Sequence, residues 1–194
     1  MSDNNKILYE KEDLLKQLDR HLDWIKSCDT KTSIALGVIG IFLTIVSSDG
    51  SFNKLNLIFS DVFGNFTFSN LLYLFFFSLF LCLFVYGVFN LIRVLVPRLS
   101  KETQVYQETH KDSLYFFEYI AKNTFSEFKE KVAHRNKEDD FNDLLSQIFI
   151  NAKICTVKYS LYNKGIKFSF VGIAGILILY VIGIVLLKTG GFHQ

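Results

Sequence analysis

Three long uncharged stretches divide the chain into alternating polar and apolar blocks. They are residues 32–48 (TSIALGVIGIFLTIVSS), 71–92 (LLYLFFFSLFLCLFVYGVFNLI) and 168–187 (FSFVGIAGILILYVIGIVLL). A helix rises about 1.5 Å per residue, so these stretches extend roughly 25–33 Å, against a hydrocarbon core of about 30 Å. Each stretch therefore predicts a transmembrane helix, and the first is the shortest.

The second and third stretches are apolar on every face. Leu, Ile, Phe and Val make up 16 of the 22 residues in the second stretch and 14 of the 20 in the third. A helix in a soluble protein rarely lacks a polar face over this length, whereas a helix surrounded by lipid needs none. The predicted fold class is an all-α membrane protein with three transmembrane helices.

The polar N-terminal block is also predicted to be helical. Leu8, Leu15 and Leu22 recur every seven residues, and Leu18 and Ile25 take the second heptad position. This pattern is typical of an amphipathic helix that packs on a partner. No strong helix breaker lies between this block and residue 48, so we expect the helix to run directly into the first span.

The block between the second and third spans predicts two short helices followed by a long one. The aromatic residues around Ser113 to Ala121 indicate the first short helix. Thr124 and Glu127 fit a capping box, which places a helix from about Ser126 to His134. From Asp140 onward, one helical face carries Phe141, Leu144, Ile148, Cys155, Tyr159 and Tyr162, while Asp143, Gln147 and Lys158 lie beside or away from it. We expect this helix to continue into the third span and to pack on the N-terminal helix as a cytosolic bundle.

These elements define the predicted organisation. The segments are a cytosolic amphipathic helix (1–31), transmembrane helix 1 (32–48), an external loop (49–70), transmembrane helix 2 (71–92), a cytosolic helical segment (93–167), transmembrane helix 3 (168–187) and an external tail (188–194). Lys and Arg are retained on the cytosolic side of a membrane. Six of them precede the first span and 13 lie in residues 93–167, which predicts a cytosolic N-terminus and an external C-terminus.

Composition and motifs argue against several functional classes. The formal net charge of +2 is too small to indicate nucleic-acid binding. The strings GxGxxG, GxxxxGK[ST], HExxH and GxSxG do not occur, and the three cysteines and four histidines are scattered. We therefore expect no enzyme, no metal site and no resident cofactor.

Small residues line one face of the first span and one face of the third. They are Ser33, Gly37, Gly40, Thr44 and Ser47 in the first span, and Gly172, Gly175 and Gly183 in the third. Small side chains let membrane helices approach closely, which favours helix packing. The alternative is that the hydroxyl-bearing face of the first span lines a wet path in an oligomer, and the residue pattern does not separate the two.

At the entry to the first span, the string HLDWIKSCDTKTSIALGVIG combines a Trp, an Asp-x-Lys and a run of small residues. The strings SLYFFEYIAKNTFSEFKEKV and DLLSQIFINAKICTVKYSLYNKGIKFSF follow in order before the final span. Together they resemble the transmembrane effectors of Pycsar, the bacterial pyrimidine cyclase system for antiphage resistance. The residues that carry the resemblance are Trp24, Asp29, Lys31, Gln147, Lys158 and Tyr159, and Thr32 stands where a smaller residue is expected.

The resemblance implies an effector of the bacterial inner membrane that responds to a cyclic nucleotide. The ligand would be cyclic UMP or cyclic CMP, made by a cognate cyclase during infection. The activated effector would impair the integrity of the membrane and cause abortive infection. From the residues alone, the alternative is a membrane scaffold that recruits a partner through its cytosolic helices and shows no toxicity on activation.

A cyclic mononucleotide needs hydrogen-bond donors for its phosphate and a flat surface for its base. The candidate nucleotide-binding residues are Trp24, Lys26, Asp29, Lys31, Arg98, Gln147, Lys158 and Tyr159. The lysines at the membrane junction are equally explained as interfacial anchors that reach towards the headgroups. Because several sites would share the free energy needed for gating, we expect a homo-oligomer.

Overall fold

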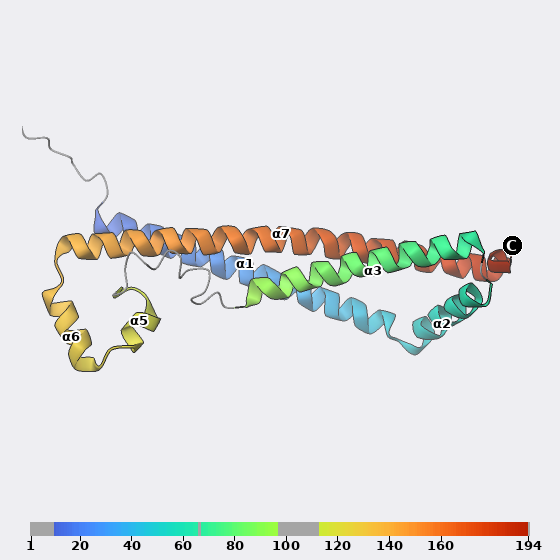
Figure 1. The fold of residues 1–194 in the computed structure, drawn as a ribbon, viewed down its shortest axis with the longest axis horizontal. Helices are drawn as coiled ribbons and strands as arrows, with labels where there is room; N and C mark the ends of the chain where they lie inside the picture. The colour runs from blue at the N-terminus through green and yellow to red at the C-terminus, as the bar shows by residue number, and fades with distance from the viewer. Residues whose placement is uncertain (1–9, 66, 97–112, 194) are drawn as a thin grey trace, which may run out of the picture. The chain divides into compact units, whose positions relative to one another are not determined.

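The computed structural model describes residues 10–65, 67–96 and 113–193, and most of them are helical. In chain order the helices are α1 (Lys11–Val46), α2 (Asp49–Gly64), α3 (Phe68–Leu95), α5 (Phe117–Ala121), α6 (Phe125–His134), α7 (Lys137–Thr189) and the short 3-10 helix η1 (Gly191–His193) (Figure 1). No strand occurs among the described residues. The predicted all-α class is confirmed.

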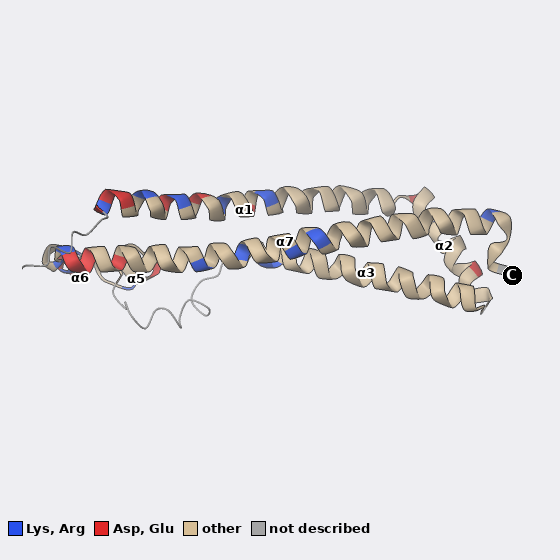
Figure 2. Cartoon of the chain, turned by 90° about the horizontal axis from the view of Figure 1, so that it is seen from above, with Lys and Arg blue, Asp and Glu red and all other residues tan. Residues whose placement is uncertain are grey.

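The chain forms two compact units. One consists of Met1–Cys28 and Pro97–Lys158, and the other of Asp29–Val96 and Tyr159–Gln194. We call them the polar unit and the membrane unit, because the charged residues of α1 and α7 concentrate in the parts that belong to the first (Figure 2). Both helices contribute to both units without a break, which confirms that the N-terminal helix enters the first span and that the long helix enters the third.

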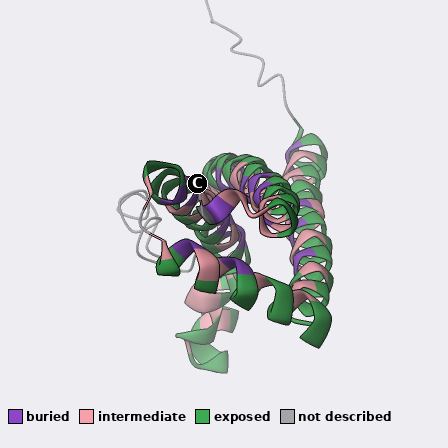
Figure 3. Ribbon diagram, turned by 90° about the vertical axis from the view of Figure 1, so that its right-hand side faces the viewer, coloured by how far each residue is buried: buried purple, intermediate pink, exposed green. Residues whose placement is uncertain are grey.

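Three helices, α1, α3 and α7, are long and apolar enough to cross a membrane. Their apolar side chains are largely exposed in the membrane unit, as Ile41 (64%), Phe75 (61%) and Ile178 (60%) illustrate. Exposed residues cover much of the helix surface in the end-on view (Figure 3). Such surfaces suit contact with lipid rather than water. The three predicted spans are confirmed.

The segment that we expected to connect the first two spans as a loop is helical over most of its length. α2 begins at Asp49, directly after the extended residue Ser48, and ends at Gly64. Its buried residues Ile58 and Val62 belong to an apolar cluster with residues of α3, α7 and η1. The segment lacks the length and apolarity of a span, and its helical character comes from one apolar face that packs on the other helices.

Glycines allow α3 and α7 to lie close together. A Cβ on Gly172 would lie 2.6 Å from the backbone nitrogen of Phe84, which is shorter than any real Cβ contact. Gly175 faces the ring of Phe80 at similarly close range, and Gly183 also meets a side chain of α3. We call this contact the glycine seam. The predicted glycine face of the third span is therefore a helix-packing surface.

The small-residue face of the first span has a different environment. All five of its residues, Ser33, Gly37, Gly40, Thr44 and Ser47, are exposed. A Cβ at Gly37 or Gly40 would have no neighbour within 4 Å among the described residues. The hydroxyls of Ser33 and Thr44 each donate to a backbone carbonyl one turn earlier, at 3.0 Å. The hydroxyls of Ser33 and Thr44 are therefore satisfied within their own helix.

Candidate functional site

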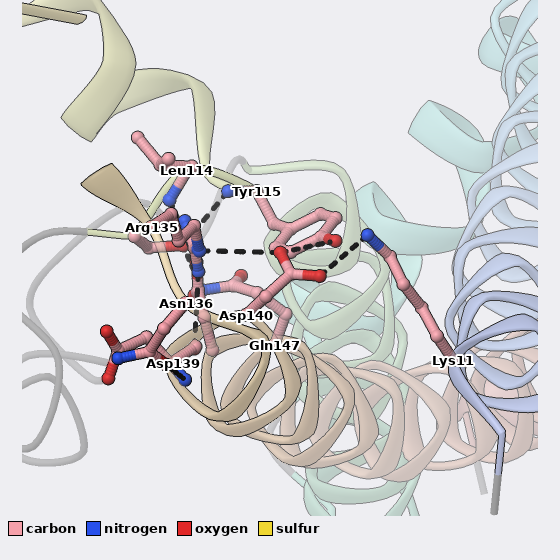
Figure 4. A network of polar contacts seen from close by, with 10 residues as sticks. Lys11, Leu114, Tyr115, Arg135, Asn136, Asp139, Asp140 and Gln147 are labelled. Carbon is pink, nitrogen blue, oxygen red and sulfur yellow. Dashed lines mark hydrogen bonds and ion pairs between the residues drawn. The ribbon is translucent and has the colours of Figure 1, made fainter. Parts of the chain in front are cut away.

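Two carboxylates near the start of α7, those of Asp140 and Asp143, bind groups from several parts of the polar unit, and Figure 4 shows the contacts of Asp140. Asp140 and Asp143 are three residues apart, so their side chains leave the helix on the same side. Asn136, the residue before α7, accepts a hydrogen bond from the backbone N–H of Asp139 at 2.8 Å and so satisfies a free amide of the first turn. The helix start is thereby fixed where the two carboxylates emerge.

Asp140 joins three side chains from different segments. Its Oδ2 lies 2.6 Å from Nζ of Lys11, in the first turn of α1. Its Oδ1 accepts a hydrogen bond from the Tyr115 hydroxyl at 3.0 Å and lies 3.3 Å from Nε of Arg135. These contacts connect α1, the segment before α5 and the α6–α7 junction to one carboxylate.

Asp143 is the more deeply buried of the two, at 2% exposed. Its Oδ2 accepts a hydrogen bond from the backbone N–H of Leu114 at 2.9 Å and a second from Nη2 of Arg135. The guanidinium of Arg135 also lies over the ring of Tyr115, 5.6 Å from its centroid. A buried carboxylate costs free energy unless it is paired and hydrogen-bonded, and Asp143 has both kinds of partner.

The partners of Asp140 together change its pKa more than its burial does. Burial alone would raise the pKa of Asp140, but the hydrogen bonds from Lys11 and Tyr115, with the positive charge of Arg135, lower it below its usual value. The hydrogen bond to Asp140 in turn raises the pKa of Lys11. The two shifts agree that the charged pair is favoured in the folded chain. Because the Lys11 side chain is 59% exposed, solvent screening keeps this gain small.

One turn further along α7, Gln147 attaches a second chain segment. Its Nε2 donates to the Ser113 hydroxyl at 3.1 Å, and that hydroxyl also accepts from the backbone N–H of Tyr115 at 3.2 Å. Gln147 is 6% exposed and Ser113 is 2% exposed. Together with the bond from Leu114 to Asp143, these contacts hold residues 113–115 along α7.

An apolar cluster accompanies this polar network. Leu14, Leu144 and Ile148 are buried in it, and Leu15, Leu18, Tyr115 and Phe141 pack against it. Leu15 and Leu18 of the predicted stripe pack here with the apolar face of the long helix, but the leucine that is buried is Leu14, which we did not place on that stripe. Leu22, which we placed on the same stripe, is 47% exposed instead. Straight helices drift by about 20° per heptad, which moves the buried face away from a strict seven-residue repeat.

Three polar residues on the long helix are buried. Asp143, Gln147 and Lys158, which we placed beside or away from the apolar face, are 2%, 6% and 6% exposed. Asp143 and Gln147 are four residues apart and follow one line along the helix, next to Leu144 and Ile148. Acidic residues near a helix start are expected from the helix dipole alone, so their presence in the sequence does not indicate this network. A line of polar residues beside a buried apolar face was the available signal.

The predicted nucleotide-binding residues are spread over both units. Trp24, Lys26, Gln147 and Lys158 belong to the polar unit, while Asp29, Lys31 and Tyr159 belong to the membrane unit. Arg98 lies outside the described residues. Of this set, Gln147 belongs to the network around Asp140 and Asp143, and Lys158 is buried further along the same helix.

The candidates on α1 are more accessible. Trp24 is 47% exposed, and its ring lies against that of His21 with 5.5 Å between the centroids. Lys26 and Lys31 are also exposed, and Asp29 and Tyr159 are partly buried. Thr32, the residue that departs from the family pattern, is fully buried. The role of these residues in nucleotide binding stays a prediction.

The described residues contain no group of three or more His, Cys, Asp or Glu side chains that could hold a metal ion. The polar network is instead built from ion pairs, hydrogen bonds and an aromatic ring that tie chain segments together. Such an arrangement can hold or release segments of the polar unit.

Three apolar spans and a polar helical unit, sharing two unbroken helices, define a membrane protein with a separate polar unit. Residues 13–187 match the family model of the Pycsar effector protein domain. Among curated proteins, the Pycsar effector protein GmPycTM of Gulbenkiania mobilis is 34% identical over 177 residues, which cover 86% of this chain and 90% of the relative. The chain belongs to the Pycsar effector family and is a membrane effector of antiphage defence. No solved structure matches it.

Proposed function

We propose that a cyclic pyrimidine mononucleotide binds the polar unit and shifts the membrane unit from a closed to a leaky arrangement. The ligand is cyclic UMP or cyclic CMP, made by a cognate cyclase during infection. The leak impairs the bacterial inner membrane and ends in abortive infection. Membership of the Pycsar effector family supports the nucleotide signal and the membrane target.

The observation that carries this proposal is the continuity of α1 and α7. Each is a single helix, Lys11–Val46 and Lys137–Thr189, and each has one part in the polar unit and one part in the membrane unit. No flexible linker interrupts either helix. A rotation or shift imposed on a helix in the polar unit is therefore carried into a span, because a helix transmits such motions as a rigid element.

The ligand and the polar network compete for the same hydrogen-bond donors. Asp140 and Asp143 hold α1, residues 113–115 and the α6–α7 junction through charged and neutral hydrogen bonds. A cyclic phosphate is an anion that binds the same kinds of donors as these carboxylates. Binding that draws donors away from the network loosens the polar unit, and this is a specific way for the ligand to favour a second arrangement.

The direct ligand contacts come from the predicted candidates of the polar unit. Lys26 supplies an exposed cation for the phosphate, and Trp24 supplies an exposed ring for the base. Gln147 and Lys158 add polar groups on α7, and both are buried. Their burial means that the site opens when the polar unit rearranges.

The free-energy requirement favours an assembly of several chains. Moving the population from 1:99 to 99:1 in favour of the leaky state needs about 5.5 kcal/mol of differential binding. A homo-oligomer divides this requirement over several sites, whereas a monomer must meet it with one. The 19 basic residues before the first span and between the second and third spans favour a cytosolic polar unit with the C-terminus outside. In this orientation the sites are accessible to a cytosolic nucleotide.

The test is a dye-leakage assay on liposomes that contain the purified full-length chain. Cyclic UMP, cyclic CMP, cyclic AMP and cyclic GMP are added separately at equal concentrations. We expect leakage with one or both pyrimidine nucleotides and little with the purine nucleotides. Equal leakage with every nucleotide and without any nucleotide would contradict the gating proposal and favour the scaffold function.

A matched pair of variants tests the candidate contacts. Lys26→Gln removes a cation that we assign to the phosphate, and it should raise the half-maximal nucleotide concentration by about 10-fold or more, as expected for one lost charged hydrogen bond. Lys16→Gln is the control, because Lys16 is an exposed lysine of the same helix that pairs with Glu12 at 2.9 Å. An equal shift in both variants would show a general charge effect rather than a binding contact.

A further inference from the structure

α2 carries a buried apolar face and, beside it, an exposed aromatic one. Ile58 and Val62 are both 1% exposed and pack against residues of α3, α7 and η1. Phe52 and Phe63 are 62% and 56% exposed. Two exposed phenylalanines on a 16-residue helix are a feature that the packing of the chain itself does not explain.

The exposed aromatic residues form a stripe. Phe52 and Phe63 are eleven residues apart, which at about 100° per residue places them within about 20° of each other around the helix axis. Phe59 lies between them, and its ring stacks on that of Phe63 with 6.1 Å between the centroids. At the same rotation per residue, Asn53, Lys54 and Asp61 lie about 80° or more from all three rings, while Asn56 borders Phe63. We call Phe52, Phe59 and Phe63 the aromatic stripe of α2.

The ends of α2 are tied to the ends of two spans. α1 ends at Val46 and α2 begins at Asp49, while α2 ends at Gly64 and α3 begins at Phe68. Both connections lie on the same side of the membrane, because α2 joins consecutive spans without crossing. At about 24 Å and with charges at Asp49, Lys54 and Asp61, α2 is too short and too polar to cross a core of about 30 Å. A helix held in this way stays at one end of the two spans that it connects.

The stripe is continuous with a surface that faces lipid. The ring of Phe59 meets that of Phe77 on α3 edge-on, with 5.1 Å between the centroids. The neighbouring residues Phe75 and Phe76 on the same span are 61% and 40% exposed. The aromatic stripe therefore extends the lipid-facing surface of a confirmed span onto the connecting helix.

We propose that α2 is an interfacial helix whose aromatic stripe inserts among the lipid acyl chains of the leaflet at this end. Its buried face holds it to the membrane unit, and its polar side faces the headgroups and water. This arrangement is that of amphipathic helices that lie in the plane of a membrane surface, with aromatic side chains at the boundary. It gives the chain a second kind of contact with the bilayer, confined to one leaflet.

Leu57 provides a matched control within α2. It is 55% exposed, almost the same as Phe63, but it lies about 120° or more around the helix from the aromatic stripe. A probe at residue 57 therefore has the same accessibility in the isolated chain and a different position relative to the bilayer. Exposure alone predicts the same behaviour at both positions, whereas the proposal predicts a difference.

The experiment places single tryptophans in the full-length chain reconstituted in phosphatidylcholine liposomes. The chain has one native Trp, so Trp24→Phe supplies the background for Phe52→Trp, Phe63→Trp and Leu57→Trp. Quenching is measured with lipids brominated on the acyl chains and, separately, with acrylamide in the water. We expect bromolipid quenching at positions 52 and 63 to be at least twofold stronger than at 57, and acrylamide quenching to show the reverse order.

Two outcomes would overturn the proposal. Equal bromolipid quenching at 57 and 63 would mean that the helix has no preferred side in the bilayer. Protection of 52 and 63 from both quenchers would mean that protein, such as a second copy of the chain, covers the stripe. Positions 52 and 63 report independently, so one misfolded variant does not remove the test. No nucleotide is needed, so the result is separate from that of the gating proposal.

Discussion

The membrane unit and the polar unit hold their helices together in different ways. In the membrane unit, Gly172 lets α7 approach the backbone of α3 at Phe84, so that the glycine seam is a close contact between helix surfaces. In the polar unit, Asp140 and Asp143 tie α7 to segments from elsewhere in the chain through ion pairs and hydrogen bonds. The first contact depends on shape and the second on charge.

The surroundings of each unit explain this difference. Lipid is as apolar as the side chains of a span, so membrane helices gain little from hiding apolar surface and associate through close packing. In water, apolar burial holds the polar unit, and its buried carboxylates must be paired. Ion pairs respond to ligands, pH and salt, whereas a close-packed seam does not. The polar unit is therefore the part in which a soluble signal can change the structure.

The largest effect is expected from Asp143→Ala. The substitution leaves Arg135, whose side chain is 14% exposed, without its buried partner and removes the acceptor for the Leu114 N–H. Breaking a buried pair on one side costs about 3–5 kcal/mol. Denaturant unfolding of the polar unit, followed by circular dichroism on the full-length chain in detergent, measures the loss. Asp139→Ala is the control, since Asp139 is exposed on the same helix turn, and equal losses would contradict the role assigned to Asp143.

Gly172→Ala tests the glycine seam, and Gly40→Ala on α1 is its control. A Cβ at Gly172 would meet the backbone of Phe84, so α3 or α7 must move, at a cost of about 1–3 kcal/mol. A Cβ at Gly40 has no close neighbour among the described residues, so that variant should be near neutral in the isolated chain. Thermal stability in detergent compares the two, and a loss at Gly40 as large as at Gly172 would mean that the α1 face is also packed.

The smallest effect is the pH dependence of the Asp140 contacts. The folded-state pKa of Asp140 is lowered, so the stability from its contacts is present above its ordinary pKa of about 3.9 and is lost as pH falls through the lowered value. The pKa of Lys11 is raised, so the stability that its charge contributes is lost only when the pH rises above about 10.4. Screening limits the effect to about 1 kcal/mol or less.

Asp140→Asn isolates this dependence. The difference in unfolding free energy between the native chain and the variant should be largest near neutral pH. It should shrink as the pH falls below about 4, first because the unfolded chain takes up a proton at Asp140 and then, at the lowered pKa, because the folded chain does. Unfolding curves between pH 3 and pH 7 measure it. A difference that stays constant over this range would show that the contacts of Asp140 do not depend on its charge.

The amino-acid sequence alone determined the three spans and the helices that continue them, because local patterns specify both. Uncharged stretches of lipid length mark the three spans, and the capping box at Thr124 and Glu127 places the start of α6, where the structure forms both of its hydrogen bonds. The unbroken course of α1 and α7 followed from the absence of breakers. The family could also be inferred, because its characteristic strings lie within these helices.

The tertiary structure alone decided which surfaces are covered. The glycines of the first and third spans look alike in sequence, yet Gly172 packs against α3 and Gly40 has an open side. Asp143 is buried because Leu114 and Arg135, 29 and 8 residues away in the chain, reach it. The connecting segment that we expected as a loop forms α2 because its apolar face packs on other helices. Burial depends on residues that folding brings from distant positions, and a local pattern does not contain that information.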